Sequence, residues 1–400
     1  MDESSPRIVA LVPAHDEETT LPAALASLRA QTLPPDLVIV VADRCTDATA
    51  DVARSLGAEV LETVGNTGRK AGALNQVLQL FPPTPSAPPP AEPRLPTPSA
   101  PPPADPRLPT PSAPPPADPR VLATLDDADL LLVLDADSAL SPDFLATAVE
   151  TLADPAVGAV GGIFHGRPGG GLPGALQRNE YTRYAREIHR RGGRARVLTG
   201  TATVFRAETL RAVAAARGTR LPGRAGEVYD SAALTEDNEI TLAVRTLGLQ
   251  AVSPSACTVR TEVMPTWRDL WHQRLRWQRG ALENLRAYGL TRVTLPYWAQ
   301  QLGMYAGILA VALFLLATAL FAALGELGPP RGLWLVVSAV FVVERIWTVR
   351  RRGPRGMLLA APLVVEFGYD LVQQAVFLAA VSAVLHGRAP RWHHLTAATV

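Results

Sequence analysis

The sequence predicts an α/β domain followed by an apolar helical region, and two observations carry this prediction. Before residue 265, short apolar runs that end in polar residues alternate with stretches of helical periodicity, as parallel strands joined by helices do. The clearest run covers residues 130–134 and is followed by Asp135 and Asp137. Beyond residue 297 the chain contains apolar runs long enough to cross a bilayer.

Composition narrows the class of protein. The 400 residues leave room for more than one domain, and a formal charge of +1 argues against nucleic-acid binding through bulk electrostatics. Cys45 and Cys257 are far apart and form no CxxC pair, so neither a disulfide scaffold nor a zinc site is expected. The first six residues contain acids and no apolar stretch, so we expect no signal peptide and a cytosolic soluble part.

The first elements predict a βαβ unit. Residues 7–14 read as a strand interrupted by Pro13, and residues 37–42 read as a second strand that ends at Asp43. Because the crossover places the ends of parallel strands at one edge of the sheet, the turn after Pro13 and Asp43 are expected to meet in one cleft. A helix over 46–57 and a third strand over 59–62 are expected next.

Residues 65–75 indicate a phosphate site. Gly65 and Gly68 precede Arg69 and Lys70 at the entry of a predicted helix, and a helix N-terminus flanked by cations suits a phosphate group. The alternative is a plain glycine turn with two solvated cations.

Asp135 and Asp137 follow the apolar run at the end of a strand, where ligands bind in open α/β sheets. If the strand continues, the two carboxylates point the same way and together suit a hard divalent cation that carries phosphates. The alternative is a turn or a helix cap, because Ser141-Pro142-Asp143 is a typical helix start.

Residues 83–121 have a different composition. A Pro-rich unit occurs there in three tandem copies that begin at 83, 96 and 109. Such a sequence forms no core, so we expect an extended or disordered insert at the N-terminal edge of the sheet, away from the carboxylates. It would act as a spacer or as a docking arm for a protein partner.

Four segments, residues 13–18, 42–47, 70–75 and 135–137, resemble the ordered nucleotide-sugar-binding motifs of family 2 glycosyltransferases with the GT-A fold. The resemblance implies a doubly wound mixed sheet with helices on both faces over residues 1–265, into which the Pro-rich segment is inserted. It also implies a nucleotide-sugar donor and a divalent cation, Mg²⁺ or Mn²⁺.

The resemblance implies roles for individual side chains. Asp16 stands where Asn is commoner, and residues 42–44 depart from the usual Asp-Asp-Gly, so the choice of nucleotide stays open, with a UDP-sugar expected. The implied nucleotide-sugar-binding residues are Pro13, His15, Glu17, Asp43, Lys70 and Asp135, and the implied metal ligands are Asp137 and Asp135.

Two further stretches suggest contacts with a membrane and an acceptor. A run of arginines and tyrosines over 178–196 predicts a cationic helix face beside an aromatic one, which suits an anionic leaflet; the alternative is a solvated face. Residues 197–205 read as a strand, and Gly200 would let a sugar acceptor approach the backbone. A β-bulge explains the same glycine.

Residues 235–242 predict a helix start, with Thr235 as the N-cap and acids in the first turn. Capping alone explains this pattern. By the family resemblance, Asp237 is the general base that takes the proton of the acceptor hydroxyl, with Glu236 beside the acceptor. The same resemblance implies a single displacement that inverts the anomeric carbon.

Residues 273–277 resemble the QxxRW motif of membrane-embedded, often processive members such as cellulose, hyaluronan and poly-N-acetylglucosamine synthases. The resemblance implies that Arg276 holds the diphosphate and that Gln273 and Trp277 contact the acceptor. A guanidinium fork does suit a diphosphate. The alternative is an interfacial region over 266–297 with tryptophans as belt residues.

Three apolar runs, over 298–324, 333–349 and 357–385, predict about three membrane spans within residues 298–390. The third run contains Glu366 and Asp370, so it lines a path, pairs with Arg345, or is not one simple span. Arginines over 350–355 mark the cytoplasmic side, so we expect a multi-pass inner-membrane protein with its first domain in the cytosol.

The expected function is that of an inverting glycosyltransferase that moves a sugar from a UDP-sugar to a cell-envelope glycan or a lipid-linked acceptor, with membrane lipid as a further partner. The motif at 273–277 favours processive synthesis. Alternatives are a non-processive transferase acting on a polyprenyl phosphate or glycolipid, a non-catalytic scaffold that displays the Pro-rich arm, and a metal-dependent phosphatase or nucleotidyl transferase.

Overall fold

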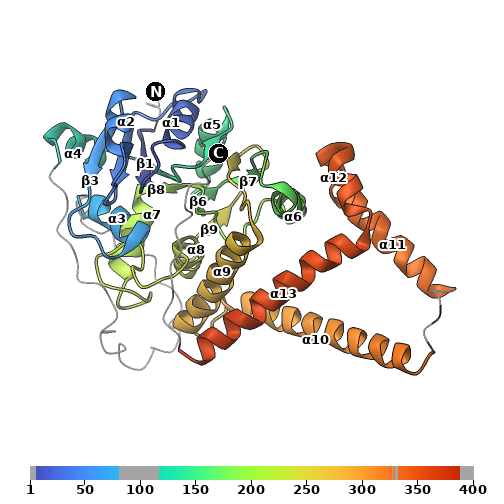
Figure 1. Cartoon of the computed structure of the whole chain (residues 1–400). Helices are drawn as coiled ribbons and strands as arrows, with labels where there is room; N and C mark the ends of the chain where they lie inside the picture. Colours follow the sequence, from blue (N-terminus) through green and yellow to red (C-terminus); the bar gives the residue numbers. More distant parts are fainter. Residues whose placement is uncertain (1–5, 81–116, 327, 329–331, 388–400) are drawn as a thin grey trace. The chain divides into compact units, whose positions relative to one another are not determined.

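The computed structural model describes residues 6–80, 117–326, 328 and 332–387 (Figure 1). The chain divides into two compact units. The first consists of Met1–Arg167 and Glu187–Glu262, and the second of Pro168–Arg186 and Val263–Val400. Residues 81–116 lie outside the described residues, so the predictions for the Pro-rich segment and its protein partner stay predictions. The last three residues of that segment, from Pro119 on, already belong to a helix.

A seven-stranded sheet forms the centre of the first unit. Its strands are β1 (Ile8–Ala14), β2 (Leu37–Ala42), β3 (Glu59–Glu62), β4 (Leu130–Leu134), β6 (Val157–Gly161), β8 (Ala202–Arg206) and β9 (Gln250–Val252). They lie in the order β3-β2-β1-β4-β8-β6-β9. β1 pairs in parallel with β2 and β4, whereas β8 runs antiparallel between β4 and β6. The predicted mixed sheet is therefore confirmed.

The sheet is covered on both faces. All residues of β4 are buried, and in β1 only Pro13 is partly exposed. Since successive side chains of a strand point to opposite faces, uninterrupted burial means that both faces are covered. The helices of this unit are α1 (Leu21–Arg29), α2 (Thr49–Ser55), α3 (Arg69–Leu78), α4 (Pro119–Asp126), α5 (Phe144–Leu152), α7 (Ala207–Ala216) and α8 (Glu236–Thr246).

A second, three-stranded sheet has the order β5-β10-β7, with β5 at Ala139–Leu140, β7 at Ile163–Gly166 and β10 at Thr258–Thr261. Two predicted boundaries in this unit differ from the structure. The helix predicted from residue 46 begins at Thr49, because the Thr46 N–H donates to Asp16 Oδ1 (2.6 Å). The strand predicted from residue 197 begins at Ala202, after a turn that contains Gly200.

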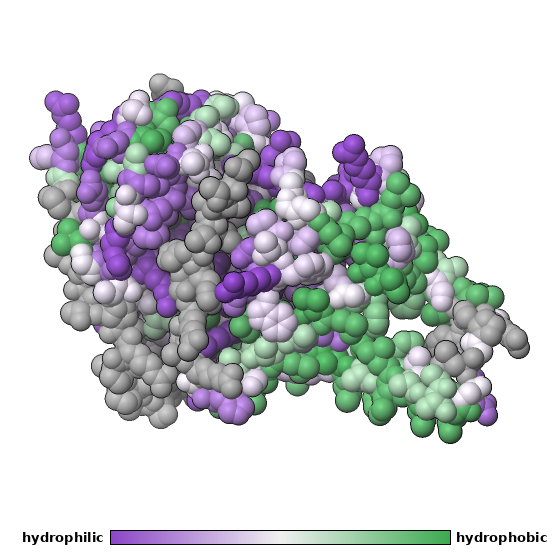
Figure 2. All heavy atoms as spheres, viewed as in Figure 1, coloured by the Kyte–Doolittle hydropathy of each residue, from purple (hydrophilic) through white to green (hydrophobic). Residues whose placement is uncertain are grey.

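The second unit is helical. Its helices are α9 (Trp267–Tyr288), α10 (Leu295–Ala323), α11 (Leu333–Thr348), α12 (Gly353–Ala360) and α13 (Leu363–Leu385), together with the first part of α6 (Gly171–Arg190). Among the described residues, α10 and α13 are long and apolar enough to cross a membrane. Figure 2 shows hydrophobic side chains gathered over the C-terminal helices, and Leu309, Leu316 and Leu320 of α10 are among those exposed.

The third predicted span is not one helix. It is divided between α12 and α13, and the helix is interrupted at Pro362, which has an extended backbone with a ψ of 101° and no N–H to continue the helical hydrogen bonds. Arg345 of α11 pairs with Asp370 (2.6 Å) and lies 3.4 Å from a carboxylate oxygen of Glu366. For residues 357–385 the sequence left open a broken span or pairing with Arg345, and the structure has both.

Part of the basic helix face predicted over 178–196 contacts protein rather than solvent. Within the second unit, Arg183 donates from Nη1 to Glu366 Oε2 (2.7 Å) and from Nε to Thr348 Oγ1 (3.2 Å). Tyr181 is buried, with 3% of its surface exposed. The helix face therefore packs against the other helices of the unit.

Candidate active site

The loops after β1 and β2 meet, as the predicted crossover requires. His15 Nδ1 lies 2.5 Å from the carbonyl oxygen of Asp43, and Thr63 Oγ1 donates to Asp43 Oδ1 (2.6 Å). Pro13, in β1, is paired with Val41 of β2. Asp16 and Arg44 adopt φ of 56° and 54°, a region that non-glycine residues rarely occupy and that is common at functional sites.

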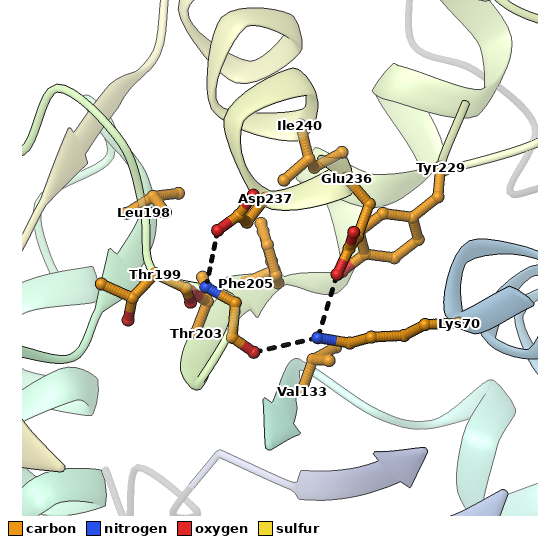
Figure 3. A pocket seen from close by; sticks show the side chains of 11 residues that line it. Lys70, Val133, Leu198, Thr199, Thr203, Phe205, Tyr229, Glu236, Asp237 and Ile240 are labelled. Carbon is orange, nitrogen blue, oxygen red and sulfur yellow. Dashed lines mark hydrogen bonds and ion pairs between the residues drawn. The ribbon is translucent and has the colours of Figure 1, made fainter. Parts of the chain in front are cut away.

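Lys70, in the first turn of α3, joins three other segments of the first unit. Its Nζ lies 2.5 Å from Asp135 Oδ1 after β4. Nζ also lies 3.2 Å from Glu236 Oε1 of α8 and donates to the carbonyl oxygen of Gly200 (3.0 Å), as Figure 3 shows. Burial by itself would lower the pKa of Lys70, but the carboxylates of Asp135 and Glu236 outweigh it and raise the pKa, so the ammonium group stays charged.

The glycine loop before α3 is shaped by Asn66. The side chain of Asn66 accepts from the Gly68 N–H (2.8 Å) and donates to the Arg69 carbonyl oxygen (2.8 Å). A Cβ on Gly72 would lie 2.2 Å from Asn66 Oδ1, so only glycine fits there while Asn66 keeps these bonds. The helix entry that presents Lys70 thus depends on a close approach that the glycine spacing makes possible.

Asp237 lies beside Gly200 in the same pocket. Its Oδ2 accepts from the Gly200 N–H (3.2 Å), and its Oδ1 accepts from the Asn238 N–H (2.7 Å). Burial, together with the adjacent Glu236, raises the pKa of Asp237 to about 6. The pocket is lined by Lys70, Val133, Leu198, Thr199, Gly200, Thr203, Phe205, Tyr229, Glu236, Asp237 and Ile240.

Asp135 and Asp137 lie in a turn rather than on a continuing strand. β4 ends at Leu134, and the Ser138 N–H donates to the Asp135 carbonyl oxygen (3.0 Å). The reasoning that strand alternation aligns the two carboxylates is therefore wrong. Asp137 Oδ1 instead accepts from Ser138 Oγ (2.8 Å) and Thr261 Oγ1 (3.5 Å).

Three acids of the first unit nevertheless share one neighbourhood. Burial raises the pKa of Glu17 to about 7, and the charges of Asp137 and Asp135 contribute to the rise. Burial also raises the pKa of Asp135, to about 6, and that of Asp137. A set of hard oxygen donors that repel one another when ionised fits a divalent cation, which would relieve the repulsion.

A second set of side chains has the spacing of a metal site. One ligand atom each of Asp16, Cys45 and Asp47 lies within 4.8 Å of the others, so these residues could hold a metal ion. Their carboxylates also serve the backbone, since Asp16 Oδ1 accepts from Thr46 N–H and Asp47 Oδ2 accepts from Glu18 N–H (3.1 Å). These bonds account for the cluster without an ion.

The remaining predicted residues, Gln273, Arg276 and Trp277, lie on α9 in the second unit. The guanidinium carbon of Arg274 lies 4.2 Å from the centre of the Trp277 ring. Arg274 also pairs with Glu180 (2.9 Å) and donates to Gln273 Oε1 (3.3 Å). Trp277 was predicted to contact the acceptor, and one face of its indole ring is covered by Arg274 of the same helix.

Two features of the site escaped sequence reasoning. Tyr229 is buried in the pocket wall, and its backbone N–H and carbonyl oxygen bond the side chain of Asn75 (2.9 and 2.8 Å). Arg217 forms a buried bidentate pair with Glu239 of α8. In the sequence, the opposite charges of Arg217 and Glu239 are the one signal that could have suggested this pair. No periodic pattern in the sequence distinguishes Tyr229.

Comparisons with known proteins agree with the fold of the chain. A family model described as "Glycosyltransferase like family 2" matches residues 6–280. The chain is similar to the solved structure of mannosyltransferase PcManGT from Pyrobaculum calidifontis in complex with GDP-Man and Mn²⁺. The two are 18% identical, with a TM-score of 0.58 over 97% of this chain and 89% of that one, which shows a shared fold.

Two other solved structures resemble the chain less closely. Glucosyl-3-phosphoglycerate synthase from Mycobacterium tuberculosis, in complex with Mn²⁺, UDP and glucosyl-3-phosphoglycerate, is 16% identical with a TM-score of 0.40, over 72% of this chain and 82% of that one. TarS from S. aureus is 16% identical with a TM-score of 0.40, over 93% of this chain and 55% of that one. No curated protein matches the sequence.

Proposed function

The chain belongs to the glycosyltransferase-like family 2 and is a glycosyltransferase, and from this premise we propose that it transfers a sugar from a UDP-sugar to a membrane-borne, lipid-linked acceptor. One observation carries the proposal. Lys70 Nζ bonds both Asp135 and the Gly200 carbonyl oxygen, while the Gly200 N–H bonds Asp237. Residues far apart in the chain thus meet as a cation, a donor-side acid and a candidate base.

In the proposed mechanism, Asp237 takes the proton of the acceptor hydroxyl. The hydroxyl oxygen attacks the anomeric carbon as the bond from that carbon to the diphosphate oxygen breaks, which inverts the configuration. Gly200 leaves room for the acceptor beside Asp237, and Glu236 orients it through a hydrogen bond. A base placed in this way contributes about 10²- to 10⁴-fold to the rate.

The donor side would be held by acids and by Lys70. Asp135 and Asp137 are the proposed ligands of Mg²⁺ or Mn²⁺, and the cation would supply charge for the departing diphosphate. Pro13, His15, Glu17 and Asp43 would line the nucleoside part of the site. Lys70 keeps its charge and offsets the acids around it, so an anionic nucleotide can enter.

Asp237→Asn tests the base. We expect transfer of radiolabelled sugar to fall by about 10²-fold or more, while UDP binding in the presence of Mn²⁺ stays unchanged. Asp51→Asn, at an exposed position in α2, serves as the matched control and should leave transfer unchanged. Unchanged glycan synthesis with Asp237→Asn would favour a non-catalytic scaffold, and nucleotide turnover without an acceptor would favour a phosphatase or nucleotidyl transferase.

We favour a single transfer over polymer synthesis. The described residues contain two candidate spans, and the most apolar part of α10 is not buried against the rest of the protein. Two spans are too few to enclose a channel for a growing glycan. Processive synthesis, suggested by Gln273, Arg276 and Trp277, is the alternative, with Arg276 on the diphosphate. The length of products from the purified chain separates the two: one added sugar supports our proposal, and a ladder supports the alternative.

The proposed location is a cytoplasmic membrane with the first unit in the cytosol. Exposed apolar side chains along α10 and arginines over 350–352 support this orientation. Extraction of the full chain by detergent, but not by high salt or alkaline carbonate, is the expected result. Release by salt alone would contradict it.

A further inference from the structure

The second unit contains two acids that are paired with arginines, and a further arginine, Arg352, that pairs with none of the described residues. Glu366 is 1% exposed and lies 2.7 Å from Arg183 and 3.4 Å from Arg345, which also pairs with Asp370. Both acids are thus engaged by Arg183 and Arg345, and Arg352 forms no ion pair with any described residue.

Three buried atoms around Arg352 have no hydrogen-bond partner among the described residues. They are Nη1 of Arg352, Nη2 of Arg183 and Oδ1 of Asn179. Arg352 and Asn179 lie on either side of Gly356, where an added Cβ would be 2.5 Å from Arg352 Cβ and 3.2 Å from Asn179 Oδ1. The unpaired donors and the unpaired acceptor therefore belong to one small region between α6 and α12.

The region has an excess of positive charge. Burial lowers the pKa of Arg352, and the nearby charge of Arg178 lowers it further. Arg352 is half-buried, but its Nη1 is inaccessible to water and has no acceptor among the described residues, and an anion that accepts from it removes the cost of that unmade hydrogen bond. An anion with hydroxyl groups would also donate to Asn179 Oδ1.

The surroundings identify the kind of anion. Trp347, Leu358 and Val364, on α11, α12 and α13, are 55%, 72% and 79% exposed. A free phosphate ion would make no favourable contact with these apolar side chains. A lipid can bind the arginines through its headgroup and the apolar side chains through its acyl chains. Basic pockets between membrane helices bind anionic lipid headgroups in this way.

We propose that Arg352 and Arg183, with Asn179, bind the headgroup of an anionic glycerophospholipid of the phosphatidylglycerol type. Its phosphate accepts from the two guanidinium groups, and its glycerol hydroxyl donates to Asn179. The side chain of Arg183 is 22% exposed, so the headgroup reaches it from the lipid-facing surface. The site lies in the second unit and is independent of the proposed reaction.

Thermal unfolding of the purified full chain tests this site. In phosphatidylcholine bilayer nanodiscs, phosphatidylglycerol at about a hundredfold excess over its Kd should raise the Tm by about 3 °C or more. Inorganic phosphate at the same concentration should not raise it. An equal rise with inorganic phosphate would overturn the lipid assignment.

Arg352→Met removes the charge and the unpartnered Nη1 while keeping an apolar side chain in its place. This variant should fold, because no bond to a described residue is lost from the guanidinium, and it should lose the Tm rise. Arg351→Met, the matched control, removes the same charge from an exposed neighbour and should keep the rise. Equal loss in both variants would show a diffuse surface charge effect and refute the site. If Arg352→Met does not fold, Arg352→Lys, which keeps the charge without the fork, should show a smaller rise than the native chain; an undiminished rise refutes the site.

Discussion

Gly200 is the residue that joins Lys70 to Asp237, the candidate base. Its carbonyl oxygen accepts from Lys70 and its N–H donates to Asp237. Backbone groups have fixed positions, so this single residue sets the distance between a mobile ammonium group and a carboxylate. A side chain at this position would point between them, since a Cβ would lie 3.4 Å from Asp237 Oδ2 and 3.5 Å from Lys70 Nζ.

Gly200→Ala should therefore fold normally and transfer sugar poorly. The distances from its Cβ are ordinary contacts, so stability should be retained, but the methyl group occupies the space proposed for the acceptor. We expect kcat/KM for the acceptor to fall by about tenfold or more, ~1.4 kcal/mol. Gly303→Ala on α10, where an added Cβ meets nothing within 4 Å, is the control. Equal rates in both variants would contradict the assignment.

The protonation of Asp237 predicts the acid limb of the pH profile. A base must be deprotonated, and its pKa is raised to about 6, so kcat/KM should fall about tenfold per unit below pH 6 and level off above it. Glu236→Gln removes a neighbouring charge that raises this pKa and should move the limb to lower pH. A limb at the pH typical of a free aspartate, or one unmoved by Glu236→Gln, would show that another group controls the rate.

At the scale of elements, the segment between α7 and α8 holds two helices of the site together. Asn75 of α3 bonds the backbone of Val228 and Tyr229, and Arg217 donates to the Val228 carbonyl oxygen (2.6 Å) and to Glu239 of α8. α3 carries Lys70, and α8 carries Asp237. The spacing of cation and base is therefore fixed through a segment that contains neither.

Arg217→Met tests this connection. Glu239 would stay buried without its bidentate guanidinium partner, and breaking a buried pair costs about 3–5 kcal/mol, so the Tm should fall markedly. Replacing both partners, as Arg217→Met with Glu239→Leu, should restore much of the stability because no uncompensated charge remains. Arg220→Met, at an exposed position nearby, is the control. A single variant as stable as the native chain would contradict the role of the pair.

At the scale of the whole molecule, the two units bury and expose different surfaces. The first covers its central strands on both faces, as a protein in water does. The second exposes large apolar side chains along α10, and its acids Glu366 and Asp370 pair with Arg183 and Arg345. Acids that pair in this way are typical of helices that lie in a membrane.

The Pro-rich segment should be dispensable for catalysis. Replacing residues 83–116 with a Gly/Ser linker about half as long should leave the initial transfer rate within about twofold, because a flexible connection only has to span the gap. The replacement stops before Asp118, whose side chain accepts from the Arg120 N–H (2.7 Å) and caps α4. A replacement that also removes Asp118 should lose ~1 kcal/mol of stability. A large loss of turnover with the shorter replacement would refute the predicted placement of the segment.

Local pattern was sufficient for the first strands of the central sheet and for the meeting of the loops after β1 and β2. The uninterrupted apolar run of β4 predicts a strand buried on both faces, and the crossover rule predicts that His15 and Asp43 meet. The directions of the Asp135 and Asp137 side chains were not predictable. The chain leaves β4 after Leu134, the last residue paired with β8, and turns between Asp135 and Ser138. The point at which a strand ends depends on strands that are distant in the sequence.

The sequence by itself determined the first three strands and β4, the apolar character of the C-terminal helices and the identity of the acids, because periodicity and residue chemistry are local properties. Tertiary structure alone decided that Lys70 bridges Asp135 and Glu236, that Tyr229 forms part of the pocket wall, and that Arg345 pairs with Asp370. These contacts join residues separated by up to 166 positions for Lys70 and Glu236. Tertiary packing brings such residues together, and the spacing of neighbouring residues in the sequence contains no information about these contacts.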